Sequence, residues 1–307
     1  MRETLNMVGI TKPAAQQELL NLRFANNKGK RIHNQFFWER ALIYLMLILF
    51  SAAALVPLLW AVSSSLKTPE QIFLFPPRWI PNPIRWENYR MAWTMAPFGR
   101  FLLNTSFLTI VITLLQLATS CLAAYAFARL QFPGRDKLFL LYLGTMMIPG
   151  QVTIIPNFIL MKFFGWVNSY KALIFPAVFN VFGTFLMRQY FLTLPYELED
   201  AAKIDGCSRF QTFLRIILPL AKPAVAALTI FVFRNEWNSF LWPLIIINDT
   251  KRMPIQVGLA FFRGELHTEW EVLLAGANIA LIPIILVFLA CQKYFIKGVA
   301  VSGFGGR

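Results

Sequence analysis

Residues 41–66 read ALIYLMLILFSAAALVPLLWAVSSSL, a run of 26 residues without a charged side chain. About 20 consecutive apolar residues in a helix are enough to cross the hydrocarbon core of a bilayer. The polar, basic residues 1–36 come first, so this run begins too late, and is too long, for the apolar part of a cleaved signal peptide. Ala52-Ala53-Ala54 resembles a cleavage site and leaves that alternative open. We interpret 41–66 as the first membrane-spanning helix.

The composition of the whole chain supports a membrane protein. Of the 307 residues, 57% are hydrophobic and 14% are charged, and the mean hydropathy is +0.55; a soluble domain has about 25% charged residues. The net charge of +14 would suggest nucleic acid in a soluble protein, but here it indicates basic loops facing anionic lipid and no nucleic-acid partner. The three cysteines are far apart, there are two histidines, and no GxxxxGK[ST] motif occurs. We therefore expect no catalytic residue, metal site or cofactor in this chain.

The distribution of charge predicts an all-α, polytopic membrane protein with six transmembrane helices. The predicted spans are 41–66, 101–128, 138–161, 172–194, 223–248 and 272–292. Pro149 and Pro156 are expected to kink the third span. With the N-terminus inside, the inner segments hold 18 Lys and Arg and the outer segments hold 10. The excess of inner positive charge predicts that both termini are cytoplasmic and that 1–36 is a cytoplasmic basic tail.

The inner segment 196–223 reads YELEDAAKIDGCSRFQTFLRIILPLAKP. The expected first helical turn holds three acidic side chains, Glu197, Glu199 and Asp200. Negative charge there suits the N-terminal end of a helix dipole. Gly206 can end this helix in the left-handed conformation, and a second helix then runs past Pro219. The segment predicts a helical hairpin on the cytoplasmic face, in which Ala201 and Ala202 form a small-residue surface for another protein.

This stretch resembles the EAA loop of bacterial ABC importer permeases. The family pattern is E-A-A, three residues, G, nine residues, and I-x-L-P. The matching positions are Asp200, Ala201, Ala202, Gly206, Ile216, Leu218 and Pro219. Asp200 departs from the family's Glu, and Glu199 lies beside it, so which carboxylate contacts the partner stays open. The alternative is an ordinary amphipathic surface helix between two spans.

Two further stretches, residues 64–89 and 237–244, look like the carbohydrate branch of that family, and the similarity covers roughly residues 40–307. It is closest to the second permease subunit of maltose-type importers. The resemblance implies a type I ABC importer transmembrane domain over 37–307, in a bacterial inner (plasma) membrane, that carries a sugar or sugar-like solute. It also implies its partners: a second, different permease subunit, two ATP-binding subunits that hold ATP and Mg, and an extracytoplasmic solute-binding protein. Glycerol 3-phosphate or a glycerol phosphodiester is the alternative solute, since the branch includes such importers.

Three polar residues in the fifth predicted span are candidates for the solute path, Arg234, Glu236 and Asn238. Charge inside a membrane is costly and usually faces protein or water. Asn238 lies four residues after Arg234 on the same helix face, whereas Glu236 points elsewhere. The alternative is a structural ion pair or hydrogen bond to another span, and the charged pair is not part of the family pattern. Side-chain amides in or near spans are open to the same two interpretations at Asn104, Gln116, Asn157, Asn180 and Asn278.

The outer segment 249–271 is the last candidate site. The resemblance implies a loop that reaches into the binding protein. The candidate contacts are Lys251, Arg252, Phe261, Phe262, Arg263 and His267. The alternative is a turn that only joins two helices. Two other classes of function remain at this point, a membrane enzyme and an ATP-independent channel; the acidic cluster 197–205 is accounted for by the EAA pattern, and no spacing resembles a selectivity filter.

Overall fold

The computed structural model describes residues 39–263 and 268–304 and divides the chain into two units, residues 1–61 and 62–307. The described part of the first unit belongs to the helix Glu39–Ser64, whose 26 residues are long and apolar enough to cross a membrane. The bounds of this helix agree with the predicted span 41–66 to within two residues at each end.

The second unit is organised around α4, Phe98–Arg129, a helix of 32 residues. It packs against α8 (Val181–Leu192) and α12 (Lys222–Trp237), and α12 packs against α15 (Trp270–Phe304). The contact between α4 and α8 requires a glycine, because a Cβ on Gly183 would lie 2.6 Å from the Ser120 hydroxyl. The core around this contact consists of buried apolar side chains, among them Ala124, Met187, Phe191, Ile217 and Leu228.

The described residues contain four helices that are long and apolar enough to cross a membrane. They are Glu39–Ser64, Phe98–Arg129, Lys171–Leu192 and Trp270–Lys293. A fifth candidate is a pair of helices, Arg209–Leu220 and Lys222–Ile246, that meet at a bend of 79°. Helical segments therefore stand at the predicted first, second, fourth and sixth spans, although a short break at residues 178–180 divides the fourth; the third and fifth predicted spans are not continuous helices either.

The prediction of one kinked helix over 138–161 is wrong. The chain instead forms α5 (Arg135–Gly144), a 3-10 turn, η1 (Thr145–Met147), and a separate helix, α6 (Ile154–Phe163). Ile148 is extended, with ψ of 115°, because the residue before a proline avoids the helical region. Pro156 causes no kink, since it lies in the first turn of α6, where an α-helix needs no N–H donor.

The fifth predicted span, 223–248, is also interrupted. Helix α12 ends at Trp237, and a short helix, α13, spans Leu241–Ile246. In a continuous helix the ring of Pro243 would collide with the carbonyl of residue 239. As a result Arg234 and Glu236 lie in the last turn of α12, next to this interruption.

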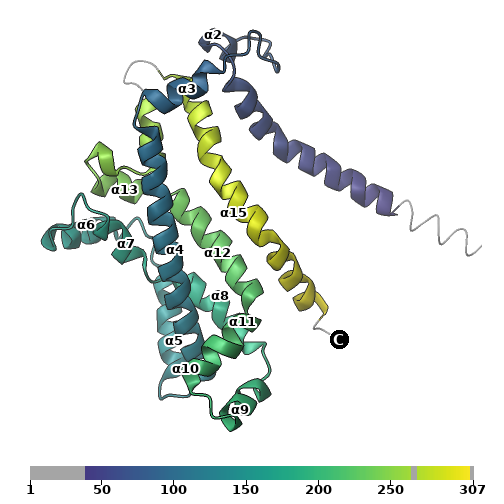
Figure 1. Ribbon diagram of the computed structural model, residues 1–307, viewed down its shortest axis with the longest axis vertical. Helices are drawn as coiled ribbons and strands as arrows, with labels where there is room; N and C mark the ends of the chain where they lie inside the picture. The colour runs from purple at the N-terminus through teal and green to yellow at the C-terminus, as the bar shows by residue number, and fades with distance from the viewer. Residues whose placement is uncertain (1–38, 264–267, 305–307) are drawn as a thin grey trace, which may run out of the picture. The chain divides into compact units, whose positions relative to one another are not determined.

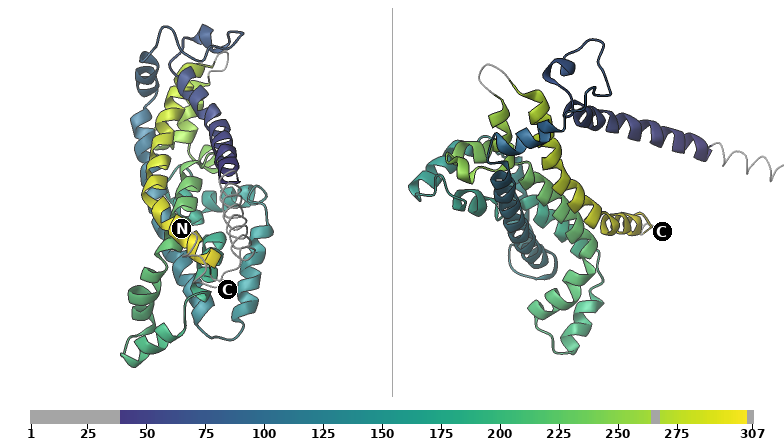
Figure 2. Two further views of the ribbon diagram at one scale, coloured as in Figure 1. Left: turned by 90° about the vertical axis from the view of Figure 1, so that its right-hand side faces the viewer. Right: turned by 45° about the horizontal axis from the view of Figure 1, so that its top comes forward.

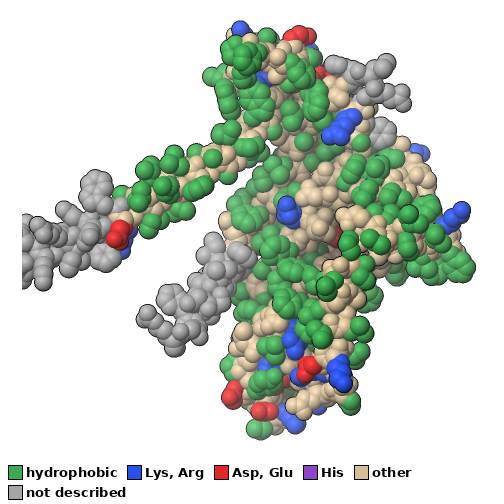
Figure 3. Space-filling model, turned by 180° about the vertical axis from the view of Figure 1, so that it is seen from behind, with side chains coloured by type: hydrophobic (Ala, Val, Ile, Leu, Met, Phe, Trp, Pro, Cys, Tyr) green, Lys and Arg blue, Asp and Glu red, His purple; other side chains and the backbone are tan. Residues whose placement is uncertain are grey.

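The two ends of α4 carry different short elements. Helices α2 (Pro69–Ile72) and α3 (Glu87–Thr94) lie near its start, and α9 (Glu197–Ile204) and α10 (Arg209–Thr212) lie near its end (Figures 1 and 2). On the face drawn in Figure 3, acidic and basic side chains gather at the end with α9 and α10, and hydrophobic side chains cover much of the surface above it. This pattern is typical of a membrane protein whose ends reach water.

Candidate functional site

The segment 196–223 forms the predicted hairpin. Helix α9 is followed by Gly206 with a φ of 80°, the left-handed conformation expected from the sequence. Ser208 then begins α10 with a capping box: its hydroxyl accepts from Gln211 N at 3.3 Å, and its own N–H donates to Gln211 Oε1 at 2.8 Å. This reciprocal pair satisfies two backbone donors and fixes the start of α10. The glycine and the capping box together set the angle of the hairpin.

The second arm of the hairpin leads into α12 through an irregular turn. A π-helical turn, η2 (Phe213–Ile217), precedes α11 (Leu218–Leu220). Pro219 lacks the N–H that an α-helix would donate to residue 215, which favours the wider turn. Ile216 and Leu218 are half-buried and Pro219 is exposed.

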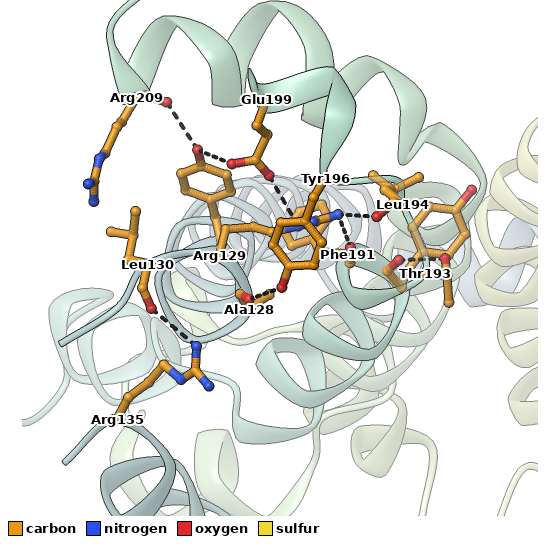
Figure 4. Close-up of polar contacts among 12 residues, drawn as sticks. Ala128, Arg129, Leu130, Arg135, Phe191, Thr193, Leu194, Tyr196, Glu199 and Arg209 are labelled. Atoms are coloured by element: carbon orange, nitrogen blue, oxygen red, sulfur yellow. Dashed lines mark hydrogen bonds and ion pairs between the residues drawn. The ribbon is translucent and has the colours of Figure 1, made fainter. Parts of the chain in front are cut away.

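Arg129, the last residue of α4, joins the hairpin to the rest of the unit (Figure 4). Its side chain is fully buried, and Nη2 donates to the carbonyls of Phe191 at 2.5 Å and Leu194 at 2.6 Å. Its guanidinium carbon lies 4.1 Å from the centre of the Tyr196 ring, and Nε lies 3.2 Å from Oε1 of Glu199. We call these five residues the Arg129 cluster. A single guanidinium thus holds the end of α8, the start of the hairpin and α9 against α4.

Tyr125 adds a second contact from α4 to the hairpin. Its hydroxyl lies 3.5 Å from Oε2 of Glu199 and 3.4 Å from the carbonyl of Arg209. Partial burial raises the pKa of Glu199 above its ordinary value, and the nearby Arg129 acts in the opposite direction. The contact with Arg129 Nε is an ion pair without hydrogen-bond alignment, which agrees with burial having the larger effect on the pKa.

The two faces of α9 differ. The Glu199 side chain is 19% exposed and Ala202 is 2% exposed, so both face this chain's own interior. Asp200 and Ala201 are exposed. The expectation that Ala201 and Ala202 together form an open small-residue surface is therefore wrong, because Ala202 is buried. Of the two neighbouring carboxylates, Asp200 is the one that a partner can reach directly.

The structure separates the three candidates for the solute path. Arg234 lines a small cavity of about 200 Å³ between α12 and α15. Asn238 donates from Nδ2 to the Arg234 carbonyl at 2.9 Å and accepts from Gln256 Nε2 at 3.1 Å. Glu236 lies on another face of α12, where Oε1 accepts from Gln116 Nε2 at 3.3 Å. The amide of Asn180 donates to Gln116 Oε1 at 2.6 Å and extends this chain of hydrogen bonds to α8.

Glu236 lines a second cavity, which is larger than the one beside Arg234 and has a volume of about 460 Å³. Its walls come from α4, α6, α12, α13 and a further helix, α7 (Lys171–Ala177). Asn157 and Trp242 line the same cavity, whereas Arg234 and Asn238 do not. Two of the other amides serve contacts between helices and loops: Asn104 donates to the carbonyls of residues 251 and 253, and Asn278 donates to the Ser65 hydroxyl.

The outer segment is folded onto the unit over most of its described length. It contains η3 (Thr250–Arg252), α14 (Ile255–Gly258) and η4 (Leu259–Phe262). Phe262 is 2% exposed and packs near Phe98, so it is not available to a binding protein in this conformation, contrary to the prediction. The basic candidates are exposed: Lys251, Arg252 and Arg263. His267 and the side chain of Phe261 lie outside the described residues.

Sequence reasoning did not identify Arg129 and Tyr125, which hold the hairpin. Both lie at the end of the second predicted span, where Arg129 served only to mark a boundary. The one available signal was that an arginine follows directly on a long apolar helix and close to an aromatic residue, a pattern common to many helix ends. Their role depends on carbonyls and a carboxylate that are more than 60 residues away along the chain.

The long apolar helices define an integral membrane protein with a helical hairpin at one end of α4. The chain belongs to the family of binding-protein-dependent transport system inner membrane components, which it matches over residues 116–301. It is thus the transmembrane subunit of an ABC transporter and not itself an enzyme. Membership of this family excludes the two rival classes of function, the membrane enzyme and the ATP-independent channel.

Individual relatives agree with this family. The chain is 36% identical over 270 residues to the probable ABC transporter permease protein YurM of Bacillus subtilis, covering 86% of this chain and 88% of that protein. It is 38% identical to the arabinooligosaccharides transport system permease protein AraQ of Halalkalibacterium halodurans, covering 74% and 81%. The sn-glycerol-3-phosphate transport system permease protein UgpE of Pectobacterium atrosepticum is 33% identical, covering 84% and 95%.

A solved structure shares the fold. It is a bacterial ABC transporter involved in the import of the acidic polysaccharide alginate, with a TM-score of 0.73 and 25% identity. The match covers 82% of this chain and 94% of that chain. The predicted fold class, an ABC importer transmembrane domain, is confirmed, although the described helices give four or five candidate spans in place of six.

Proposed function

We propose that this chain is one of two different permease subunits of an importer for a sugar or a sugar-like solute. Two separate ATP-binding subunits hold ATP and Mg and dock on the hairpin, and a solute-binding protein delivers the solute at the outer face. Both termini lie in the cytoplasm. Relatives named for arabinooligosaccharide and for sn-glycerol 3-phosphate transport support the solute class and also keep glycerol 3-phosphate as the alternative solute.

The two faces of α9 are the observation that carries this proposal. One face is tied to α4 and α8 through the Arg129 cluster, and the other presents Asp200 and Ala201 to solvent. A partner that binds the exposed face therefore moves α9 against a buried guanidinium that also holds the ends of two long helices. This arrangement can transmit force from an ATPase to the spans without any chemistry in this chain.

Reversing the charge at Asp200 tests the docking face. Asp200→Lys leaves the Arg129 cluster intact, so we expect normal insertion and assembly of the permease pair. Binding of the ATP-binding subunits should fall about tenfold, because reversal of a contacting charge adds repulsion to the lost attraction. Co-purification of the ATPase and ATP-dependent uptake in proteoliposomes are the measurements.

Glu87→Lys is the matched control for that test. Glu87 is an exposed acidic residue on α3, near the opposite end of α4, and its replacement changes the net charge equally. The control should co-purify with the ATPase as the wild type does. Wild-type co-purification and uptake by Asp200→Lys would contradict docking on this face of α9.

A further inference from the structure

The cavity beside Glu236 has one ionisable group in its wall. None of its lining residues is Lys, Arg or His, and all of them lie in the described part of the chain. Glu236 is half-buried, and its Oε1 is occupied by the amides of Gln116 and Asn235. No hydrogen bond to Oε2 occurs among the described residues. The wall therefore holds a carboxylate that is fixed through one oxygen and has the other available as an acceptor.

The remaining wall combines neutral polar groups with an aromatic side chain. Asn157 from α6 and Ser239, after α12, line the cavity together with Asn235. Trp242 is held in place because its indole N–H donates to the Ala172 carbonyl at 3.0 Å. A fixed indole offers an apolar surface to the C–H faces of a sugar ring, while amides and hydroxyls match its hydroxyl groups. A volume of about 460 Å³ falls within the range of small-molecule sites.

We infer that this cavity is a solute subsite in this subunit and that it takes a neutral polyhydroxyl solute, with Glu236 as the hydrogen-bond acceptor for its hydroxyl groups. The inference rests on the proposed function, and it decides between the two solutes left open above. A phosphate group entering this cavity meets no cation in the lining, and a charged group without a counter-charge is costly in a setting of low dielectric. Glycerol 3-phosphate is therefore disfavoured.

The test uses the complete importer in proteoliposomes, with its binding protein at saturating concentration. The probes are the neutral sugars arabinotriose and maltotriose, and sn-glycerol 3-phosphate. Glu236→Gln keeps the shape of the side chain but replaces one of its two acceptor oxygens by an amide that only donates. We expect sugar uptake to fall about tenfold, while ATPase activity stimulated by the loaded binding protein stays within about twofold, since docking and closure are untouched. The number of ATP molecules hydrolysed per sugar should rise accordingly.

Lys171→Gln is the matched control, because it removes an exposed charge from α7, a helix of the cavity wall, at a position outside the lining. It should leave the ratio of ATP to sugar unchanged. Asn157→Ala changes the part of the wall that α6 contributes, and it should raise that ratio independently of any folding defect in Glu236→Gln. Wild-type ratios in both cavity variants, or uptake of sn-glycerol 3-phosphate alone, would overturn the subsite. Uptake of a probe that does not depend on ATP would instead contradict the proposed function itself.

Discussion

The hairpin 196–223 and the outer segment 249–271 were both identified as contact surfaces, but they are built in opposite ways. Helix α9, the first arm of the hairpin, is held to the unit by polar contacts with Arg129 and Tyr125, and its outer face stays exposed; the second arm packs Phe213 and Ile217 into the core. The outer segment is held by apolar burial, with Ile255 and Phe262 in the core and the Ile255 N–H bonded to the Thr105 hydroxyl.

This difference shows what makes a surface suitable for transmitting motion. A helix such as α9, which is held by few polar contacts, can move as one body while its open face binds a partner. A segment whose side chains fill the core cannot move without losing packing. The exposed basic residues of the outer segment, Lys251 and Arg252, are then the part of it left for a binding protein, and they remain a prediction.

The largest expected effect comes from Arg129→Ala. This change removes two hydrogen bonds to carbonyls and the contact with Tyr196, and it leaves the partly buried Glu199 without its counter-charge. Hydrogen bonds to a charged group contribute about 1.5–3 kcal/mol each, so the loss of two of them should cost about 3–5 kcal/mol. Chemical unfolding in detergent should show a loss of that order, and the ATPase should co-purify poorly because α9 is no longer fixed.

Arg135→Ala provides the comparison. Arg135 pairs with the exposed carboxylate of Asp136, and exposed pairs contribute less than about 1 kcal/mol. If Arg129→Ala were no more destabilising than Arg135→Ala, the hairpin would not depend on the Arg129 cluster.

Gly258→Ala probes the apolar packing of the outer segment. An added Cβ would lie 2.1 Å from Cδ2 of Phe101, a ring that is itself fully buried and cannot easily move away. Overpacking of this kind costs about 1–3 kcal/mol. We expect reduced stability in detergent with normal ATPase docking. Gly144→Ala, where nothing lies within 4 Å of the new Cβ, should be neutral; equal stability of the two variants would show that the segment is loosely packed.

The sequence predicts the parts of the structure that depend on local chemistry. The long apolar runs give the spans of α4 and α15, and Gly206 gives the end of α9, because each depends on residues close together in the chain. The breaks at 148–153 and after Trp237 come from prolines whose effect, a kink or an interruption, depends on the surrounding packing. The sequence could not predict that the Glu199 side chain faces the interior, because its partner is an arginine 70 residues earlier in the chain.

The smallest effect on stability is expected from Glu199→Gln, which tests whether the charge of the Glu199 carboxylate matters for holding α9. Arg129 keeps both carbonyl acceptors and the Tyr196 ring in this variant, and the amide oxygen can still accept from Tyr125. We therefore expect a change in the free energy of unfolding below about 1 kcal/mol at neutral pH.

The effect of pH on the stability of the wild type relative to Glu199→Gln has a definite sign. Because partial burial raises the pKa of Glu199 in the folded state, folding favours its protonated form. The stability of the wild type relative to Glu199→Gln should thus be greatest below the ordinary pKa of a glutamate and fall as the pH rises through the raised value. Unfolding measured across that range compares the two proteins directly. A relative stability that increases with pH would mean that the ion pair with Arg129 outweighs burial, and that the inner face of α9 is held mainly by charge.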